Sequence, residues 1–355
     1  MRKPRLFSAL ATGLLAAISL TSQAAPKTDF SLCWTLYAGW MPWEYGAAQG
    51  IVDKWAKKYG INIDVVQIND YVESINQYSA GQFDGCTMTN MDALTIPAAS
   101  GVDSTALIIG DFSNGNDGIV LKGEQKTLGD LKGQPVNLVE LSVSHYLLAR
   151  GLEKAGLSEQ DLSVVNTSDA DLVAAFATNE VKAVTTWNPL LAEIEATPKV
   201  TKVFDSSQIP GEIIDLMVVN TTTLKDNPAL GKALTGAWYE IMATMSADNA
   251  AGITAREHMA KASGTDLAGY QAQLALTKMF YSAKDAVAFA NSPKLPATMN
   301  KVAEFSFSHG LLGEGAQSSD AIGMAFANGV TTGDADNLKL RFDPSYMQMA
   351  ADGSL

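Results

Sequence analysis

The stretch LCWTLYAGWMPWEYG, residues 32–46, decides the fold of this chain. Its first half alternates large apolar residues with smaller or polar ones, which is the pattern of a half-buried strand. The strand breaks at Gly39, an aromatic loop follows, and a helix begins near Ala47. Strand, loop and helix form the first unit of an α/β domain, in which ligands lie beyond the carboxyl ends of the strands.

The loop itself points to ligand binding. Core packing alone is a poor explanation for two tryptophans at the end of a strand. Indole faces also attract cations. We therefore expect Trp40 and Trp43 to stack on a ligand and Glu44 to contact it. Two alternatives remain open. Either indole packs on a lobe surface, or Glu44 only favours the N-terminus of the following helix.

Residues 1–24 have the features of a signal peptide. A basic start and an apolar run precede Ser22-Gln23-Ala24, and we place the cleavage after Ala24. No cysteine directly follows the apolar run, and no later stretch is long and apolar enough to span a bilayer. The sequence predicts a periplasmic protein that is not lipid-anchored.

Charge narrows the choice of ligand. Removal of the three basic residues in the leader moves the net charge from -13 to -16, which disfavours nucleic acid and anionic lipid. The remaining arginines are Arg150, Arg256 and Arg341, and none ends a predicted strand. Anion sites commonly use arginine for its bidentate geometry, so the sequence favours a cation or a neutral ligand.

A mature chain of about 330 residues is expected to form two lobes. Two sets of βα units are joined by a polar, glycine-rich crossing at 111–118, and the chain returns through Asp215. From Asn227 onward the pattern is nearly all helical. The predicted divisions are residues 25–117 for the first part of lobe 1, 118–216 for lobe 2, and 217–355 for the return to lobe 1.

Cys33 and Cys86 both lie in predicted strands. An exported protein permits a disulfide. A bridge between neighbouring strands needs unusual geometry, so we favour two separate buried thiols.

Three segments resemble one known group of proteins. GWMPW (39–43), FDGCTMTNMD (83–92) and SVSHYLL (142–148) are similar to periplasmic substrate-binding proteins of the nitrate/sulfonate/taurine ABC-transporter superfamily. The resemblance is closest to the branch associated with urea carboxylase, whose ligand is thought to be urea or guanidinium. It implies a type II binding-protein fold, a hinge between two lobes, and delivery of the ligand to a membrane permease.

The strand ends supply the remaining site candidates. Asp111 and Glu140 are the preferred carboxylate partners, with Asp215 as a third, and hinge hydrogen bonding is the alternative for each. Trp187 ends a strand of the opposite lobe, where it either closes an aromatic sandwich or forms a buried wall. Further polar contacts or helix caps come from Asn90 and Ser144.

We expect guanidinium as the ligand, because carboxylates in its plane and aromatic faces above and below match its shape and charge. Urea is the second candidate. A sulfonate, taurine or nitrate is the third and would rely on backbone N–H groups at helix starts.

An exported enzyme is only the fourth candidate. Its low rank follows because no nucleophile or phosphate-loop motif is present and the three histidines are far apart in the sequence. We therefore expect a monomeric, non-enzymatic binder of a small molecule. No catalytic residue, cofactor or metal is predicted, and the expected partner is an ABC permease.

Overall fold

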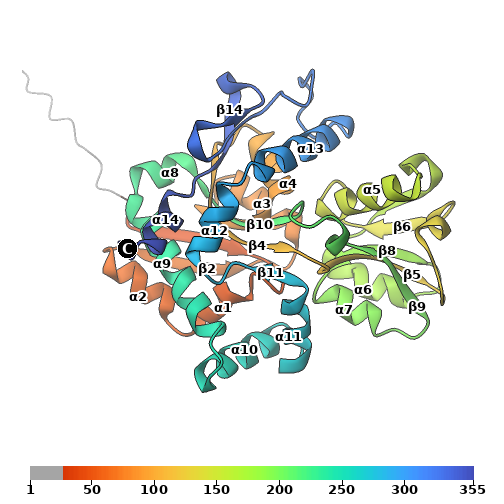
Figure 1. Ribbon diagram of the computed structural model, residues 1–355, viewed down its shortest axis with the longest axis horizontal. Coiled ribbons are helices and arrows are strands. Elements are labelled where there is room, and N and C mark those ends of the chain that lie inside the picture. The colour runs from red at the N-terminus through yellow and green to blue at the C-terminus, as the bar shows by residue number, and fades with distance from the viewer. Residues whose placement is uncertain (1–26) are drawn as a thin grey trace, which may run out of the picture.

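The computed structural model describes residues 27–355, so the predicted signal peptide lies outside the described residues. These residues form two β-sheets, and the chain crosses between them twice (Figure 1). We call the elements around the larger sheet the first lobe and those around the smaller sheet the second lobe. This is the two-lobed α/β fold that the sequence predicts.

The larger sheet has nine strands. They are β1 (Asp29–Trp34), β2 (Asn62–Gln67), β3 (Gly85–Thr89), β4 (Ser104–Ser113), β10 (Ile214–Asn220), β11 (Thr277–Met279), β12 (Gly323–Ala325), β13 (Thr331–Thr332) and β14 (Leu338–Phe342). β1 pairs in parallel with β2 and β3, whereas β10 runs antiparallel between β3 and β4. The first lobe therefore has a mixed sheet.

The smaller sheet has five strands and forms the right-hand part of Figure 1. In spatial order they are β7 (Ser163–Asn166), β6 (Pro135–Leu138), β8 (Ala183–Trp187), β5 (Asp117–Lys122) and β9 (Val200–Asp205). The helices of this lobe are α5 (Val143–Ala155), α6 (Asp169–Ala177) and α7 (Leu190–Glu195).

The helices of the first lobe surround the larger sheet. They are α1 (Met41–Ala48), α2 (Ile51–Lys58), α3 (Tyr71–Ser79), α4 (Asn90–Ala93), α8 (Thr221–Asp226), α9 (Pro228–Met245), α10 (Ala250–Ala262), α11 (Leu267–Ala275), α12 (Ala283–Ala290), α13 (Lys294–Ser308) and α14 (Ser345–Ala351). Among residues 27–355, no helix has both the length and the apolar character needed to cross a membrane.

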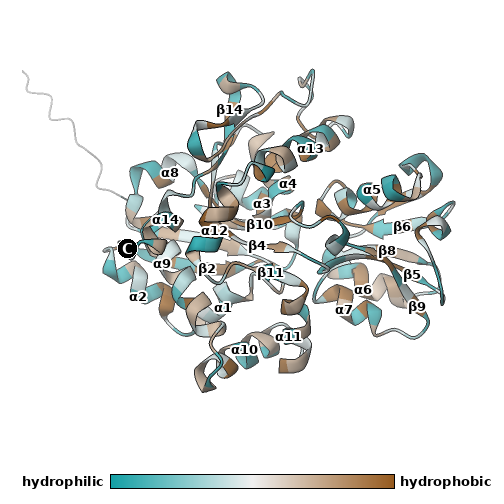
Figure 2. Cartoon of the chain, viewed as in Figure 1, coloured by the Kyte–Doolittle hydropathy of each residue, from teal (hydrophilic) through white to brown (hydrophobic). Residues whose placement is uncertain are grey.

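The core of the first lobe lies around the central strands. β4 is buried along nearly its whole length, which is why its sequence is an apolar run rather than an alternation. Figure 2 shows the same contrast, with apolar central strands and polar outer faces on the helices. α9 packs against α1, α2 and α10, and Trp238 and Ile241 lie on its buried face, as its helical spacing predicts.

Three sequence expectations are wrong in detail. The aromatic loop after Gly39 is largely the helix α1, whose Pro42 lies in the first turn, where a missing N–H costs nothing. The C-terminal part is not nearly all helix, because β11, β12, β13 and β14 extend the larger sheet.

Cys33 and Cys86 form a disulfide instead of two separate thiols. β1 and β3 are parallel neighbours with these two residues in register, which brings their Cα atoms to 4.4 Å.

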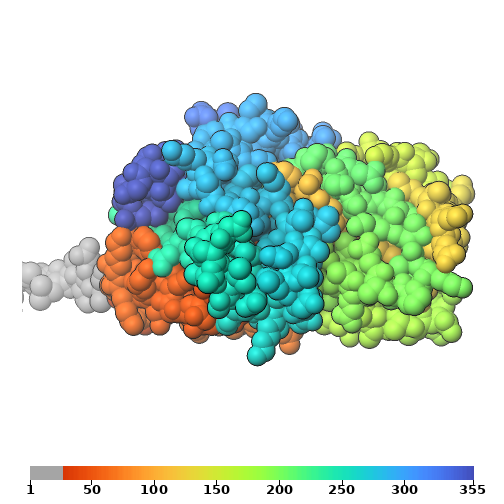
Figure 3. Space-filling view, turned by 60° about the horizontal axis from the view of Figure 1, so that its bottom comes forward, coloured from red at the N-terminus to blue at the C-terminus, as the bar shows by residue number. Residues whose placement is uncertain are grey.

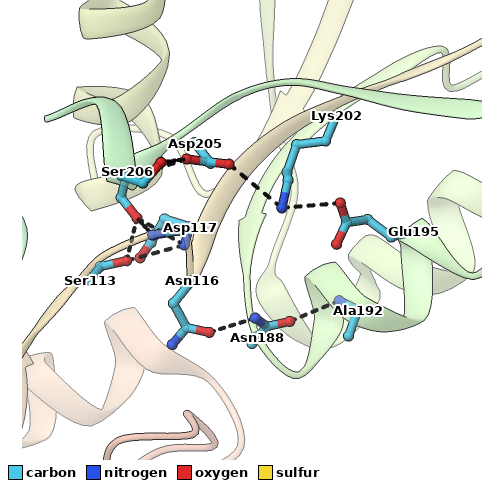
Figure 4. A network of polar contacts seen from close by, with 11 residues as sticks. Ser113, Asn116, Asp117, Asn188, Ala192, Glu195, Lys202, Asp205 and Ser206 are labelled. Carbon is cyan, nitrogen blue, oxygen red and sulfur yellow. Dashed lines mark hydrogen bonds and ion pairs between the residues drawn. The ribbon is translucent and has the colours of Figure 1, made fainter. Parts of the chain in front are cut away.

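Both crossings between the sheets are short and are tied together (Figure 4). The chain leaves the larger sheet at Ser113 and returns to it at Ile214. The hydroxyl groups of Ser113 and Ser206 lie 2.6 Å apart. Asp117 donates its backbone N–H to Ser113 Oγ at 3.1 Å. One crossing thus holds the other, as a hinge requires. The predicted lobe boundaries at residues 117 and 216 stay predictions.

Candidate functional site

A small pocket lies between the two lobes, with a cavity volume of about 10 Å³ for the centre of a water-sized sphere, which is room for about one water molecule. The first lobe and the returning crossing contribute one side, and β5, α5 and β8 contribute the other. Its lining residues are Tyr37, Trp40, Tyr71, Thr89, Asp117, Val143, Trp187, Ile213 and Asp215. Two of them end a strand and two begin a helix, as expected for a ligand site in an α/β protein.

Two cross-strand pairs give the pocket its charge and shape. Asp111 and Asp215 face each other where β4 and β10 pair in the larger sheet. Asp117 and Trp187 face each other where β5 and β8 pair in the smaller sheet. Each pair lies near the strand ends next to a crossing, so the two pairs meet where the lobes meet.

Aromatic rings form the walls. Trp40 and Tyr71 are stacked with ring centroids 5.8 Å apart, and Trp187 meets Tyr71 edge-on at 5.5 Å. Trp40 and Trp187 are only 4% and 5% exposed. Trp40 Nε1 is buried and has no hydrogen-bond partner among the described residues. The walls therefore offer π faces and one indole donor to a bound molecule.

Three buried carboxyl groups lie at or directly behind this pocket. Tyr37 donates its hydroxyl proton to Asp111 Oδ1 at 3.0 Å. In the part of the chain described, no other residue donates to Asp111 Oδ2 or Asp215 Oδ2, so at these oxygens the two buried carboxyl groups bond only to each other, through a shared proton. Burial raises the pKa of Asp111 to about 7 and that of Asp117 to about 7. Burial and the nearby Asp111 raise the pKa of Asp215 well above its usual range.

Gly39 shows how closely the chain approaches this cluster. A Cβ atom at Gly39 would lie 2.5 Å from Asp111 Oδ2 and 2.5 Å from the ring of Tyr37. Only glycine fits there without a shift of these side chains. The turn after β1 is therefore packed directly against the carboxylates.

No lysine, arginine or histidine from residues 27–355 lines the pocket. Arg150 pairs with Glu212 and Glu153, and the other arginines are also engaged elsewhere. Arg341 pairs with Asp103, and Arg256 donates to backbone carbonyls. The buried negative groups consequently have no built-in cationic partner.

The structure brings some of the predicted site residues together. Trp40, Trp187 and Asp215 line the pocket, and Asp111 lies directly behind it. Asn90 is buried in α4 but holds the returning crossing, because its amide donates to Glu212 O at 3.1 Å and its oxygen accepts from Ile214 N at 2.9 Å.

Ser144 is buried in the first turn of α5, beside the lining residue Val143. Its hydroxyl has no hydrogen-bond partner within the described chain.

Three predicted residues lie away from the pocket. Because α1 is a helix, successive side chains point in different directions, and Trp43 packs against Trp238 at 5.2 Å between ring centroids. Glu44 pairs with His258 at 2.9 Å. Glu140 is exposed at the end of β6, where its backbone N–H donates to Asn166 Oδ1. Asp117 takes the place in the pocket that we expected for Glu140.

Sequence reasoning missed Tyr37, Tyr71 and Asp117. Asp117 ends the glycine-rich crossing, so the crossing itself was the available signal. Tyr71 begins α3, and its hydroxyl donates to Asp92 Oδ2 at 2.7 Å. Burial raises the pKa of Asp92 to about 6. No sequence pattern marks Tyr71, because its place depends on how the lobes meet.

The lobes are in contact along their junction, on the face shown in Figure 3 as well as beside the pocket. Asp169 of the second lobe accepts from the backbone N–H of Tyr71 at 3.3 Å, and Ser168 donates to Asp70 at 2.9 Å. Trp187 Nε1 donates to Leu36 O at 3.4 Å. The arrangement is therefore closed around the pocket.

Comparison with known families gives a match over residues 54–249, which is more than half of the chain, to the model described as NMT1/THI5 like. The chain belongs to the NMT1/THI5-like family. The match includes the second lobe, both crossings and several strands of the larger sheet.

Among curated relatives, a putative binding protein of Brucella abortus is 27% identical over 139 residues. That alignment covers 39% of this chain and 42% of the relative, so the chain spans less than half the length of this relative.

Solved structures show the same fold. The periplasmic aliphatic sulphonate-binding protein SsuA of Escherichia coli matches with a TM-score of 0.66 at 18% identity, covering 82% of this chain and 95% of that one. The periplasmic nitrate-binding protein NrtA of Synechocystis PCC 6803 matches with a TM-score of 0.58 at 13% identity, covering 94% and 100%. The chain has the two-lobed periplasmic binding-protein fold.

Proposed function

We propose that this protein is the solute-binding component of an ABC importer and captures a small planar cation, with guanidinium as the leading ligand. The observation that carries the proposal is the set of three buried carboxyl groups at an aromatic pocket without a basic residue. The protein would act outside the inner membrane and deliver the solute to a permease.

The electrostatic argument begins with the cost of burying charge. A carboxylate removed from water without a partner is strongly unfavourable, and it either takes up a proton or recruits a cation. Asp111, Asp117 and Asp215 are at most 3% exposed. A cation in the pocket would supply the missing counter-charge.

Shape favours guanidinium over a spherical ion. Its edge donates N–H groups in its plane, which suits bidentate contact with a carboxylate such as Asp215. Its faces stack on aromatic rings, which Trp40, Tyr71 and Trp187 provide. Urea has a similar outline but no charge, so it would leave the carboxylates unneutralised.

Two of the structurally similar proteins bind a sulphonate and nitrate, respectively, so an anion replaces urea as the second candidate. An anion here would face Asp117 and Asp215 across a small pocket, with no arginine or lysine of the described chain to offset the repulsion. The charge of the lining is the reason that we place the cation first.

Ligand binding is expected to favour the closed arrangement. A molecule held between Trp187 of the second lobe and Trp40 of the first contacts both only when the lobes meet. Such differential contacts shift the population toward the closed form. The permease would recognise that form.

Isothermal titration calorimetry tests the proposal directly. Mature protein is titrated with guanidinium, urea, taurine and nitrate, and guanidinium is expected to bind the tightest. Asp215→Asn should weaken guanidinium binding by roughly 30-fold or more, since loss of one partner of a buried charged pair costs at least about 2 kcal/mol. Glu44→Gln removes an acid outside the pocket and should leave the affinity unchanged.

Tight binding of taurine or nitrate would refute the cation argument. Equal affinity for urea and guanidinium would show that the carboxylates do not distinguish a charged ligand from a neutral one.

A further inference from the structure

The chain has three histidines, and the fold brings two of them to one glutamate. His145 lies in the first turn of α5, and Glu159 begins the short helix η3 (Glu159–Asp161), both in the second lobe. His309 directly follows α13 of the first lobe. Their spacing in the sequence predicts no metal site, so the cluster exists only because of the fold.

The donor atoms of these three side chains all lie within 4.8 Å of one another. Glu159 Oε1 is 3.2 Å from His145 Nε2 and 2.8 Å from His309 Nε2. Ligand bonds of about 2.0–2.1 Å in a tetrahedral zinc site place neighbouring donor atoms about 3.3 Å apart. Two of the three separations are therefore within about 0.5 Å of what one ion requires.

The outer contacts of His309 suit coordination. Its Nδ1 lies 2.8 Å from Phe305 O, a geometry in which Nδ1 carries the proton and Nε2 faces Glu159 with a lone pair. Metal-binding histidines usually donate their other ring N–H to such a carbonyl.

His145 is buried, with a side chain only 3% exposed, and its Nε2 makes no hydrogen bond of good geometry within residues 27–355. Its Nδ1 accepts the backbone N–H of Leu141 at 3.1 Å. Coordination through Nε2 moves the ring proton to Nδ1 and releases that N–H. Coordination therefore requires the turn before α5, in which Leu141 is 39% exposed, to shift so that this N–H no longer points at the ring.

We propose that His145, Glu159 and His309 bind a divalent transition-metal ion between the two lobes. Two nitrogen ligands and one carboxylate oxygen suit zinc and leave a fourth position for water. Because His309 comes from the first lobe and the other two ligands come from the second, the complete site exists only when the lobes meet. Bound metal would stabilise the closed arrangement.

Calorimetry with Zn²⁺ tests the site in the absence of any solute. The mature protein is expected to bind one ion per chain, and the same protein loaded with Co²⁺ should show the visible absorption of a tetrahedral site. His309→Ala and Glu159→Gln should each weaken Zn²⁺ binding tenfold or more and abolish the cobalt spectrum.

His258→Ala is the matched control. His258 pairs with Glu44 in the same way but has no third ligand among residues 27–355, so this variant should bind Zn²⁺ like the original protein. Loss of Zn²⁺ binding in His258→Ala would overturn the assignment. Absence of one-to-one binding, or unchanged binding in His309→Ala, would show that the cluster is a metal-free hydrogen-bonded contact between the lobes.

A second consequence rests on the proposed function. If guanidinium and the metal both favour the closed form, each raises the affinity for the other by the same factor. Saturating Zn²⁺ should tighten guanidinium binding in the original protein but not in His309→Ala. An unchanged guanidinium affinity would refute this coupling, whereas loss of guanidinium binding altogether would count against the proposed function and leave the Zn²⁺ titration as the test of the metal site.

Discussion

Lowering the pH from 8 to 5.5 should weaken guanidinium binding, because the ligand must displace protons from buried carboxyl groups. Burial raises the pKa of Asp111 to about 7 and that of Asp117 to about 7. Below pH 7 these groups are therefore largely protonated in the empty pocket. Guanidinium keeps its own charge throughout this range.

The size of the effect follows from the number of protons released. A group with a pKa of 7 that must ionise for binding lowers the affinity by about tenfold for each pH unit below 7. One such proton gives a loss of about 30-fold between pH 8 and pH 5.5, and two give a loss of about 1,000-fold. Asp111 and Asp215 face each other across two strands, so they are expected to titrate as a pair.

Calorimetry in buffers of different ionisation enthalpy measures the protons released on binding, and affinities at several pH values give the slope. Asp117→Asn should release one proton fewer and flatten the slope by one unit. An affinity that is independent of pH would indicate a neutral ligand such as urea. An affinity that rises as the pH falls would indicate an anion, and either result refutes the reasoning.

Four other predictions concern stability and ligand affinity. Asp117→Asn should stabilise the ligand-free protein at pH 8 by up to about 4 kcal/mol in urea unfolding, since a pKa raised from 3.8 to about 7 makes stability fall as the pH rises from 4 to 7. Combined Cys33→Ala and Cys86→Ala should lower stability by about 4 kcal/mol, because a loop of 53 residues opens. Trp187→Ala should weaken guanidinium binding roughly tenfold. Trp43→Phe should lower stability and leave that affinity unchanged.

Three of these have a control or a result that contradicts them. Asp117→Asn at pH 5 serves as the control, because most of the gain should be absent there. Unchanged unfolding of the double cysteine variant would show that the bridge does not constrain the unfolded chain. Weaker binding in Trp43→Phe would mean that the packing of α1 on α9 controls the pocket.

The sequence predicted the larger features because they depend on local patterns. The alternation around Leu32 marks β1, and the helical spacing around Trp238 marks α9, because each side chain's burial follows from the period of its own element. The crossing at 111–118 was visible from its glycine and polar residues. These signals do not require knowledge of which elements become neighbours.

The differences between the expected positions of site residues and those in the structure have the opposite origin. Glu140 and Asp117 both lie at strand ends, so the sequence treats them alike. β5 and β6 both flank β8. β5 runs antiparallel to β8, so its first residue, Asp117, lies opposite Trp187, whereas Glu140 lies beyond the paired residues of β6 and is exposed. The choice between the two acids therefore depends on the direction and register of strand pairing. Pro42 and the nearby aromatic residues also led us to expect a loop where the structure has α1. The helix points Trp43 and Glu44 away from the pocket.

The position of the acids connects recognition with closure. Asp117 lies where one crossing enters the smaller sheet, and Asp215 lies where the other crossing re-enters the larger sheet. The crossings also touch through Ser113 and Ser206, so the carboxylates cannot move far apart when the lobes open. Without a cation, protons must offset their repulsion. A bound cation would replace those protons at the hinge itself. It would also contact Trp187 of the second lobe and Trp40 of the first, and so favour the closed arrangement.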